Sequence, residues 1–340
     1  MSTLELVKYT QIMNNFTLIP FDRIMRFGQR TMLDRPLFNV SWILGRFCNY
    51  RCSYCWPYAN TDTPDYQDLE VYKNTVDEIK RQARANGFTE FHFSFSGGEP
   101  TAYKKFPQLV EHYANDGESE YQSIHLTTNL SPAGSWWKKF IGLTGRLQRR
   151  SVTASYHAEF ASEQEFGDKC LQLMDAGVFV TINQVMVPQQ FDDYYERCER
   201  FHGRGINVTL KPQSDPTASF IVDGYSDEQI EKLQTNFPQN NQGQPIMQMH
   251  FEDAKGNTYG MDQAERMNAF GFNRFMNWKC SAGYQSCVIR GVEVKRAYSC
   301  AEEPLGTLTG GFTLFKAPSK CITSTCVSSA DSKIPKEKHV

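Results

Sequence analysis

The sequence lacks several features that would assign it to large classes of protein. No stretch approaches the roughly 18 consecutive apolar residues that span a bilayer, so we expect no membrane partner. The 36 basic and 38 acidic side chains leave a net charge of −2, which argues against a broad basic surface for nucleic acid. Residues 1–8 lack the basic-then-apolar pattern of a secretory signal. We therefore expect a soluble, cytoplasmic protein.

Cysteine is too scarce for a disulfide scaffold, at ten in 340 residues, and cytosolic proteins keep their thiols reduced. The ten are unevenly spread, with one group at 48–55 and five residues in the stretch 280–326. Cysteines grouped in this way more often hold metal or carry out redox chemistry. Cys170 and Cys198 stand alone within helical patterns, and we expect both to be small buried residues.

Strand-like and helix-like segments alternate between about residues 38 and 212. The strand candidates are 38–43, 90–96, 122–129, 151–157, 178–187 and 206–212. Apolar residues spaced by three and four predict helices between them. Strands separated by helices pair in parallel, and six such units predict an α/β fold with a partial (β/α)6 barrel. In such sheets, ligands bind at the carboxyl ends of the strands.

The rest of the chain follows a different pattern. We divide the whole into an N-terminal arm (1–37), the barrel (38–215), a helical or irregular connector (216–275) and a small cysteine-rich C-terminal domain (276–340). In the connector, Ser226 with Gln229 three residues later predicts a capping box that begins a helix near 226–236. In the C-terminal domain, residues 288–297 predict a β-hairpin.

The first cysteine group follows the first predicted strand. Cys48, Cys52 and Cys55 are separated by gaps of three and two residues. Three thiolates can hold three corners of a four-iron cluster, which leaves the fourth iron open to an exogenous ligand. A zinc site completed by a distant His or Cys is the alternative, but zinc ligands usually come as two separated close pairs. The spacing therefore favours an iron–sulfur cluster.

The second motif follows the second predicted strand. Its residues are Gly97, Gly98, Glu99 and Pro100. The paired glycines allow the backbone to approach a ligand closely. Taken alone, the four residues are equally consistent with an ordinary turn.

The cysteine spacing, the aromatic Tyr54 before the last cysteine and the position after a first strand resemble radical S-adenosylmethionine (SAM) enzymes. In that family, the open iron binds the amino and carboxylate groups of SAM. Reduction then releases a 5′-deoxyadenosyl radical, which abstracts hydrogen from a substrate. The segment Gly97–Pro100 resembles the family motif that binds the SAM amino group.

Further positions match the family more weakly. Thr128 and Asn129 resemble its strand-end Thr-Asn. Ser155, Asn183 and Lys211 lie on later strands where SAM contacts usually occur. Each of these could equally be a packing residue. The cofactor contacts implied by the resemblance are Tyr54, Gly97, Gly98, Glu99, Pro100, Thr128, Asn129, Ser155, Asn183 and Lys211.

The C-terminal cysteines resemble the auxiliary-cluster extensions called SPASM and twitch, most specifically in the opening Cys280-x-Ala-Gly. The resemblance implies one auxiliary iron–sulfur cluster, expected to be [4Fe-4S], held by Cys280, Cys300, Cys321 and Cys326. The fifth C-terminal cysteine, Cys287, is not assigned to this cluster. The alternative is a structural zinc ribbon.

The resemblance implies a radical SAM oxidoreductase that uses a SAM-binding [4Fe-4S] cluster on a peptide or small-molecule substrate. Its outcome would be dehydrogenation, crosslinking or epimerisation. Flavodoxin or ferredoxin would supply the electron. A methyl- or methylthiotransferase and a non-catalytic zinc module are the alternatives. His157, Glu159 and Tyr298 are candidates for a substrate acid or base.

Overall fold

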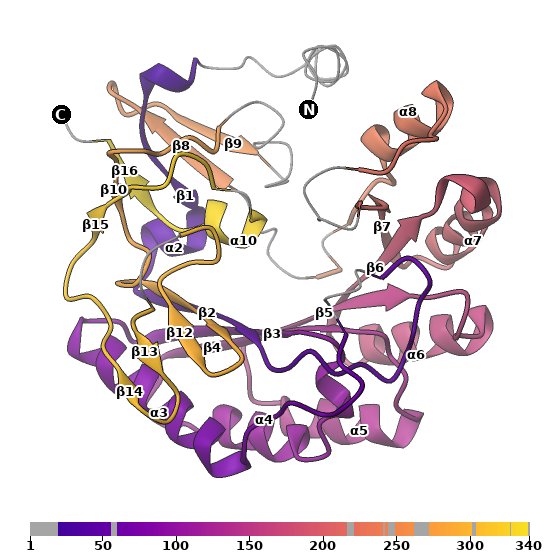
Figure 1. The fold of residues 1–340 in the computed structure, drawn as a ribbon, viewed down its shortest axis with the longest axis horizontal. Helices are drawn as coiled ribbons and strands as arrows, with labels where there is room; N and C mark the ends of the chain where they lie inside the picture. Colours follow the sequence, from indigo (N-terminus) through magenta and orange to yellow (C-terminus); the bar gives the residue numbers. More distant parts are fainter. Residues whose placement is uncertain are drawn as a thin grey trace.

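The computed structural model describes residues 20–55, 60–215, 221–240, 242–243, 249–261, 272–300, 304–326 and 328–338. The fold is α/β, as the sequence predicts, with two sheets that face each other (Figure 1). The larger sheet has ten strands in the order β14-β13-β12-β11-β2-β3-β4-β5-β6-β7, and the smaller has six in the order β15-β10-β16-β1-β8-β9. No helix in the described part of the chain is long and apolar enough to cross a bilayer.

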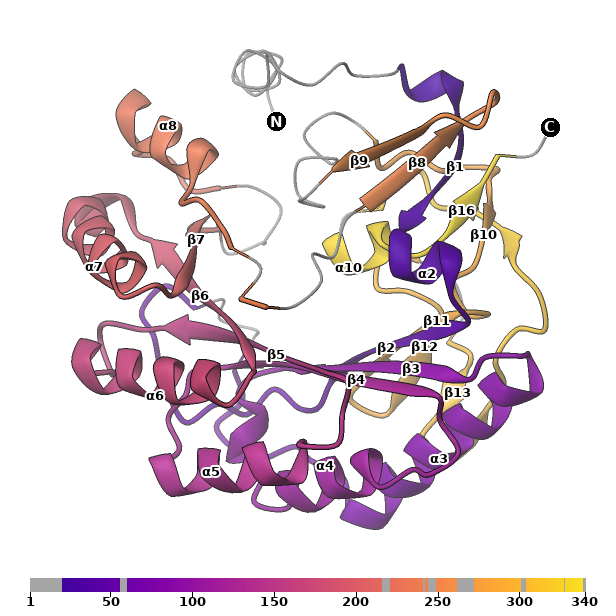
Figure 2. The ribbon, with the colours of Figure 1, turned by 180° about the vertical axis from the view of Figure 1, so that it is seen from behind.

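Six parallel strands form the centre of the larger sheet, in chain order. They are β2 (Leu37–Ile43), β3 (Glu90–Ser96), β4 (Tyr121–Thr128), β5 (Arg149–Tyr156), β6 (Phe179–Met186) and β7 (Asn207–Pro212). The helices between them cover the outer face (Figure 2). These are α3 (Leu69–Ala85), α4 (Phe106–Ala114), α5 (Gly134–Leu143), α6 (Glu163–Asp175) and α7 (Phe191–Gly203). The predicted six-unit partial barrel is therefore confirmed.

Alternation along the strands separates an apolar outer face from a polar inner face. In β3, Phe91, Phe93 and Phe95 are fully buried. The Phe93 ring lies 4.6 Å from that of Tyr113 on α4, which shows that the phenylalanines pack under the helices. His92 is only partly buried and faces the concave interior. Burying each phenylalanine stabilises the sheet by roughly 1.5–3 kcal/mol, which fixes the register.

The predicted C-terminal hairpin is present, but it also extends the barrel sheet. It consists of β11 (Ser286–Arg290) and β12 (Glu293–Lys295), followed by β13 (Gly306–Thr307) and β14 (Gly311–Phe312). Strand β11 pairs in parallel with β2, with Ser286 opposite Asn39 and Arg290 opposite Ile43. The sequence analysis did not predict this pairing, because the two strands are more than 240 residues apart.

The smaller sheet joins segments that the sequence analysis treated as separate. Its strands are β1 (Ile24–Gln29), β8 (Met249–Asp253), β9 (Thr258–Met261), β10 (Lys279–Cys280), β15 (Ser319–Lys320) and β16 (Lys336–Glu337). Because β1 lies between β8 and β16, the described part of the N-terminal arm contains a central strand of this sheet, followed by the short helix α2 (Arg30–Asp34). The connector likewise holds a β8–β9 hairpin, whose short polar strands gave no alternating pattern. The predicted capping box of α8 (Asp227–Thr235) is confirmed.

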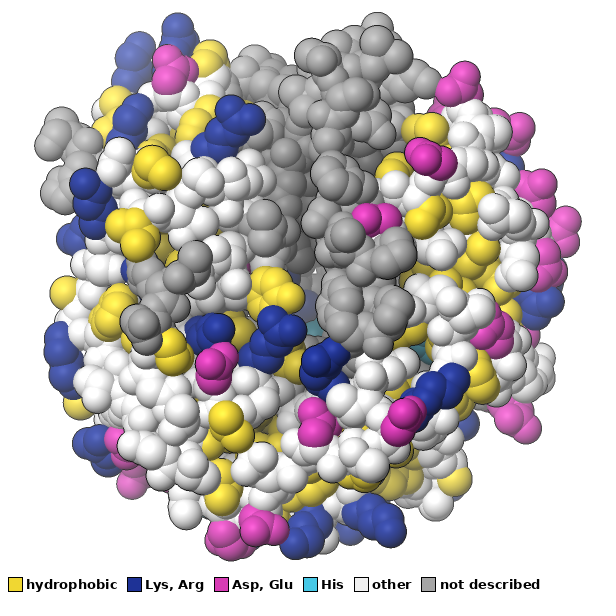
Figure 3. Space-filling view, viewed as in Figure 1, with side chains coloured by type: hydrophobic (Ala, Val, Ile, Leu, Met, Phe, Trp, Pro, Cys, Tyr) yellow, Lys and Arg dark blue, Asp and Glu magenta, His cyan; other side chains and the backbone are white. Residues whose placement is uncertain are grey.

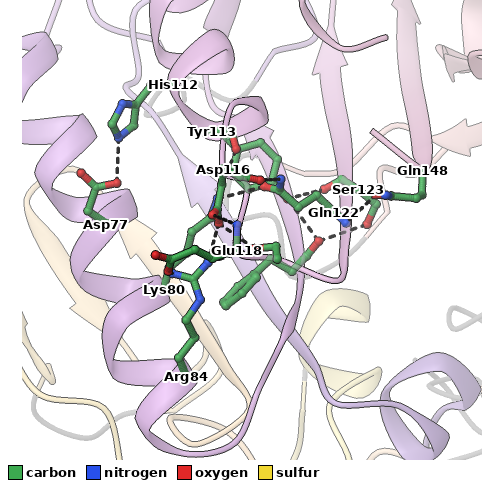
Figure 4. A network of polar contacts seen from close by, with 12 residues as sticks. Asp77, Lys80, Arg84, His112, Tyr113, Asp116, Glu118, Gln122, Ser123 and Gln148 are labelled. Carbon is green, nitrogen blue, oxygen red and sulfur yellow. Dashed lines mark hydrogen bonds and ion pairs between the residues drawn. The ribbon is translucent and has the colours of Figure 1, made fainter. Parts of the chain in front are cut away.

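A buried ion-pair network joins α3 to the loop before β4 (Figure 4). The Lys80 ammonium is 3% exposed and lies 2.8 Å from the Asp116 carboxylate. Arg84 donates to the same carboxylate over 2.6 Å. Lys80 also donates to the Gln122 side chain and to the Tyr113 carbonyl. The buried lysine is therefore fully hydrogen-bonded, which is what makes its burial tolerable.

We expect Asp116→Asn to lower the free energy of unfolding by about 3 kcal/mol, because it leaves the Lys80 charge buried without its partner. Urea unfolding at pH 7 measures the change. Burial raises the pKa of Asp116, but hydrogen bonds from Lys80 and Ser119 outweigh it and hold the pKa below its usual value of 3.8. The ionised Asp116 therefore stabilises the fold fully above pH 3.8, and this stabilisation is lost as the pH falls further below that value. The difference in unfolding free energy between the wild type and Asp116→Asn should accordingly disappear in acid.

Asp77→Asn is the matched control, since this carboxylate pairs with His112 at the surface and is 62% exposed. Asp77→Asn should lower the free energy of unfolding by less than about 1 kcal/mol. Equal losses in the two variants would contradict a buried role for Asp116.

Candidate active site

Cys48, Cys52 and Cys55 lie in the loop after β2, at the carboxyl edge of the parallel strands. Three N–H donors approach the sulfurs: the Tyr50 amide is 3.4 Å from Cys48 Sγ, the Asn60 side chain 3.5 Å from Cys55 Sγ, and the Asn129 side chain 3.9 Å from Cys48 Sγ. Such donors are a common feature of thiolate ligands in iron–sulfur sites. The donor set therefore fits a cluster.

Burial disfavours the thiolate form of two of these cysteines, Cys48 and Cys52. Burial raises the pKa of Cys52 to about 12, with further contributions from Cys55 and Glu159. Within the described ranges, no three His, Cys, Asp or Glu side chains surround the position of a single metal ion. A cubane spreads its ligands over several irons, so its thiolates lie farther apart than the ligands of one zinc ion.

The glycines of the second motif are required for packing against the chain that leads into the cysteine loop. A Cβ atom on Gly97 would lie 2.3 Å from the Gly45 carbonyl oxygen, and one on Gly98 would lie 2.2 Å from that of Phe47. The Gly98 amide donates to the same Gly45 carbonyl over 2.9 Å. The structure thus gives these glycines a packing role, and their contact with a ligand stays a prediction.

Glu99 joins the ends of β3 and β4. Its carboxylate is buried and accepts four hydrogen bonds. The donors are the Thr101 amide (2.9 Å) and hydroxyl (2.6 Å), the Thr128 hydroxyl (2.8 Å) and the Asn129 amide (2.6 Å). Burial raises the pKa of Glu99 even though these hydrogen bonds oppose it. The Asn129 side chain continues the network to Asn49 of the cysteine loop over 3.0 Å.

A segment after β5 holds the other side of the cysteine loop, and we call residues 157–160 the clamp. Ser53 donates its amide to Glu159 over 2.9 Å and its hydroxyl to the same carboxylate. The Tyr54 hydroxyl lies 2.9 Å from His157 Nδ1. The Phe160 ring stacks on Tyr50 at 4.8 Å. Each of these contacts is made to a residue that lies between two of the three cysteines in the loop, namely Tyr50, Ser53 or Tyr54.

The clamp changes the interpretation of two acid or base candidates. Burial lowers the pKa of His157 to about 4, so its ring is neutral near pH 7. His157 and Glu159 both bind the cysteine loop, which makes them positioning residues. Tyr298, the third candidate, is 44% exposed and lies under the guanidinium of Arg290.

We expect Glu159→Ala to release iron to a chelator roughly tenfold faster than the wild type, because both hydrogen bonds to Ser53 are lost. Glu165→Ala, at an exposed position on α6, is the control and should behave as the wild type. Equal rates for the Glu159 variant and the wild type would show that the clamp does not hold the loop. Iron release is followed by absorbance under anaerobic conditions.

The weaker candidates lie on the concave face of the later strands. Ser155 on β5 is directly opposite Asn183 on β6, and Lys211 on β7 is opposite Val185. The structure thus places Ser155 and Asn183 side by side above the polar interior. Gln184, the neighbour of Asn183, is fully buried on the opposite face.

The sequence analysis missed Asp65, whose carboxylate accepts the amides of Arg46 and Phe47 over 2.8 and 3.1 Å. This contact shapes the chain just before Cys48. An isolated acidic residue in a polar loop carries no sequence signal, so only the tertiary structure could identify it.

The C-terminal cysteines separate into two environments. Cys280, Cys321 and Cys326 are buried together in the core of the smaller sheet, and Cys300 packs against that core. Burial raises the pKa of Cys300 to about 11 and of Cys326 to about 12, and the proximity of Cys280 adds to both. Cys287 instead belongs to the barrel core. The four cysteines expected to act together are thus close, and the fifth is apart.

The barrel region matches a known protein family. Residues 42–234 match the radical SAM superfamily. A curated relative, the cysteine-type anaerobic sulfatase-maturating enzyme of Clostridium novyi (strain NT), is 29% identical over 99 residues. That match covers 27% of this chain and 26% of the relative, so it spans about a quarter of each.

Solved structures extend the likeness to most of the chain. Native anSMEcpe with bound AdoMet has a TM-score of 0.50 and 17% identity, covering 80% of this chain and 78% of that one. Native anSMEcpe with bound AdoMet and Kp18Cys peptide also has a TM-score of 0.50, with 16% identity over 80% and 77% of the two chains. At such identities, the likeness shows the fold.

Proposed function

Because the chain belongs to the radical SAM superfamily, we propose that it is an oxidoreductase that cleaves SAM reductively and abstracts hydrogen from a substrate. When bound, a [4Fe-4S] cluster supplies the electron that breaks the carbon–sulfur bond of SAM. The observation that carries the proposal is the three-cysteine loop, held at the carboxyl edge of the sheet by the Glu99 network on one side and the clamp on the other.

In this proposal, Cys48, Cys52 and Cys55 hold the cluster, and N–H groups directed at two of the sulfurs stabilise their thiolate form. Ser155, Asn183 and Lys211 extend from neighbouring strands toward the space that SAM would occupy. Their hydroxyl, amide and ammonium groups suit the polar ribose and adenine edges. The backbone of residues 97–100 and the side chains of Thr128 and Asn129 set the shape of the same edge.

A second group, Cys280, Cys300, Cys321 and Cys326, would hold one auxiliary iron–sulfur cluster, proposed to be [4Fe-4S]. Their shared burial in one core supports this assignment. In this proposal, the auxiliary cluster would accept an electron from the product radical or bind the substrate. The separation of Cys287 into the barrel core supports leaving it out of the ligand set.

We further propose a peptide substrate, with a small molecule as the alternative. A curated relative is a sulfatase-maturating enzyme, and one structure of similar fold contains a peptide. The outcome proposed after hydrogen abstraction is dehydrogenation, crosslinking or epimerisation. A flavodoxin or ferredoxin in the cytoplasm would deliver the electron.

Anaerobic purification and reconstitution test the proposal. The protein should contain iron and labile sulfide, and after reduction with dithionite it should convert SAM to 5′-deoxyadenosine, detected by chromatography. A colourless protein that holds zinc, with neither iron nor sulfide, would refute the proposal and support the non-catalytic alternative. Methylated product in place of 5′-deoxyadenosine would identify a methyltransferase.

A further inference from the structure

The interior of the barrel contains a cavity of about 270 Å³, close to the lower limit of roughly 300–1,000 Å³ for ligand pockets. Strands β2 to β6 line one side, and β11 and the residues around α10 (Ser329–Ser332) line the other. Most of its lining residues are of polar types. Among the lining side chains are Ser41, His92, Ser94, His125, Ser151 and Thr153.

The cavity lies directly below the proposed SAM contacts. Thr153 and Thr181 line it on β5 and β6, and the proposed contacts Ser155 and Asn183 are two residues farther along the same faces. Two residues of a strand span about 6.6 Å. The cavity therefore lies within one pair of strand residues of the proposed SAM contacts, and the inference below rests on the proposed function.

The two histidines in the cavity wall are neutral hydrogen-bonding groups. The Ser151 hydroxyl donates to the Ile124 carbonyl, so it accepts from His125 Nδ1 at 2.8 Å. His125 Nε2 then accepts from Thr153 at 3.1 Å. His92 contacts Ser123 through its Nδ1 at 2.8 Å. Both ring nitrogens of His125 are thus engaged by hydroxyl groups, and burial lowers the pKa of its ring, which favours the neutral imidazole.

Two cations line the same cavity. Arg149 lies at the amino end of β5 and is 9% exposed, and Lys333 follows α10. Burial lowers the pKa of His92 and of His125 to about 3, and these two cations contribute to both shifts. Both cations therefore lie near enough to the two histidines to affect them.

Asp331 is the carboxylate among the described lining residues, and it is engaged elsewhere. It accepts the backbone amides of Tyr298 and Ser299 over 3.0 and 2.5 Å. The space-filling view shows Lys and Arg side chains beside Asp and Glu side chains around the middle of this face (Figure 3). A hydroxyl group has one donor and two acceptor positions, so the wall hydroxyls can still accept a hydrogen bond from a polar ligand.

We propose that the barrel interior binds an anionic oxygen group of the substrate, a carboxylate or a phosphate, against Arg149 and Lys333. His92 and the wall hydroxyls bind the uncharged polar part that joins this group to the reacting carbon. Arginine and lysine both suit such oxygens, with arginine able to form two parallel hydrogen bonds. The substrate, whether peptide or small molecule, thus enters the barrel with an anionic end first.

Calorimetric titration of the reconstituted enzyme tests this. Saturating SAM fills its own site, reductant is omitted, and chloride keeps the ionic strength constant. The probes are inorganic phosphate, succinate and the uncharged succinamide. We expect at least one anion to bind, and succinamide to bind at least tenfold more weakly. Binding of phosphate alone would identify a phosphorylated substrate, and binding of succinate alone a carboxylate.

Arg149→Gln and Lys333→Gln should each raise the dissociation constant of the bound anion at least tenfold. Lys139→Gln, which removes an exposed charge on α5, should leave it unchanged. Lys333 is less buried than Arg149, so its variant keeps the test valid if Arg149→Gln fails to fold. Failure of both anions to bind the wild type, or unchanged binding in both variants, would overturn the proposal.

The two proposals fail separately. Formation of 5′-deoxyadenosine by the wild type without anion binding would refute only the inference about the interior. Anion binding without 5′-deoxyadenosine would refute only the proposed function.

Discussion

Cys52→Ala should reduce formation of 5′-deoxyadenosine from SAM by at least about a hundredfold. Loss of a group that only orients a metal ligand typically costs 10–100-fold, and removal of a ligand itself should cost more. With two thiolates left on the loop, the cluster loses one of its three protein attachments. Chromatography after dithionite reduction measures the product, and the iron content of the same sample shows whether the cluster is lost.

Cys198→Ala is the matched control for this variant. Cys198 is fully buried on α7 within the barrel core, far along the chain from either cysteine group. The substitution removes one thiol and should leave SAM cleavage within about twofold of the wild type, since it acts only through packing. Wild-type cleavage by the Cys52→Ala protein would end the proposal that this loop holds the cluster.

Cys321→Ala should remove the proposed auxiliary cluster and leave the SAM-binding cluster in place. We expect about four iron atoms per chain in place of about eight, because one of two four-iron clusters loses a ligand. SAM cleavage without substrate should persist, since the first cysteine loop is unaltered. Iron and sulfide analysis, together with the electron paramagnetic resonance spectrum of the reduced protein, gives the number of clusters.

Cys287→Ala is the control in the same part of the chain, because this thiol is equally buried but lies in the barrel core. It should retain the full iron content. Loss of iron in this variant, or full iron in Cys321→Ala, would contradict the division of the C-terminal cysteines into four ligands and one bystander.

Two parts of the fold act on the same loop. The Glu99 network reaches Asn49 from the ends of β3 and β4, while the clamp reaches Ser53 and Tyr54 from the end of β5. A loop held from both sides loses less entropy when it binds a cluster, because its conformations are already restricted. The parallel arrangement of the strands explains this convergence, since their carboxyl ends all open on one edge.

The strand pattern of the barrel could be predicted closely from the sequence. All six predicted strands are present to within two residues, because alternating burial leaves a strong period of two in segments such as 90–96. The isolated Cys170 and Cys198 are buried, as expected. The functional motifs were also visible, because cysteine spacing and the paired glycines are local features of the chain.

The sequence alone determined the fold class, because local periodicity encodes it, and the cysteines on which the proposed chemistry depends, because their spacing is a local feature. The superfamily followed from the resemblance of these motifs to a known family. Only the tertiary structure decided that β1 lies at the centre of a second sheet, that β11 extends the barrel, and that Arg149 and Lys333 share one cavity with His92. These features join residues far apart in the chain. Their pairing depends on how whole surfaces pack, and no local pattern records it.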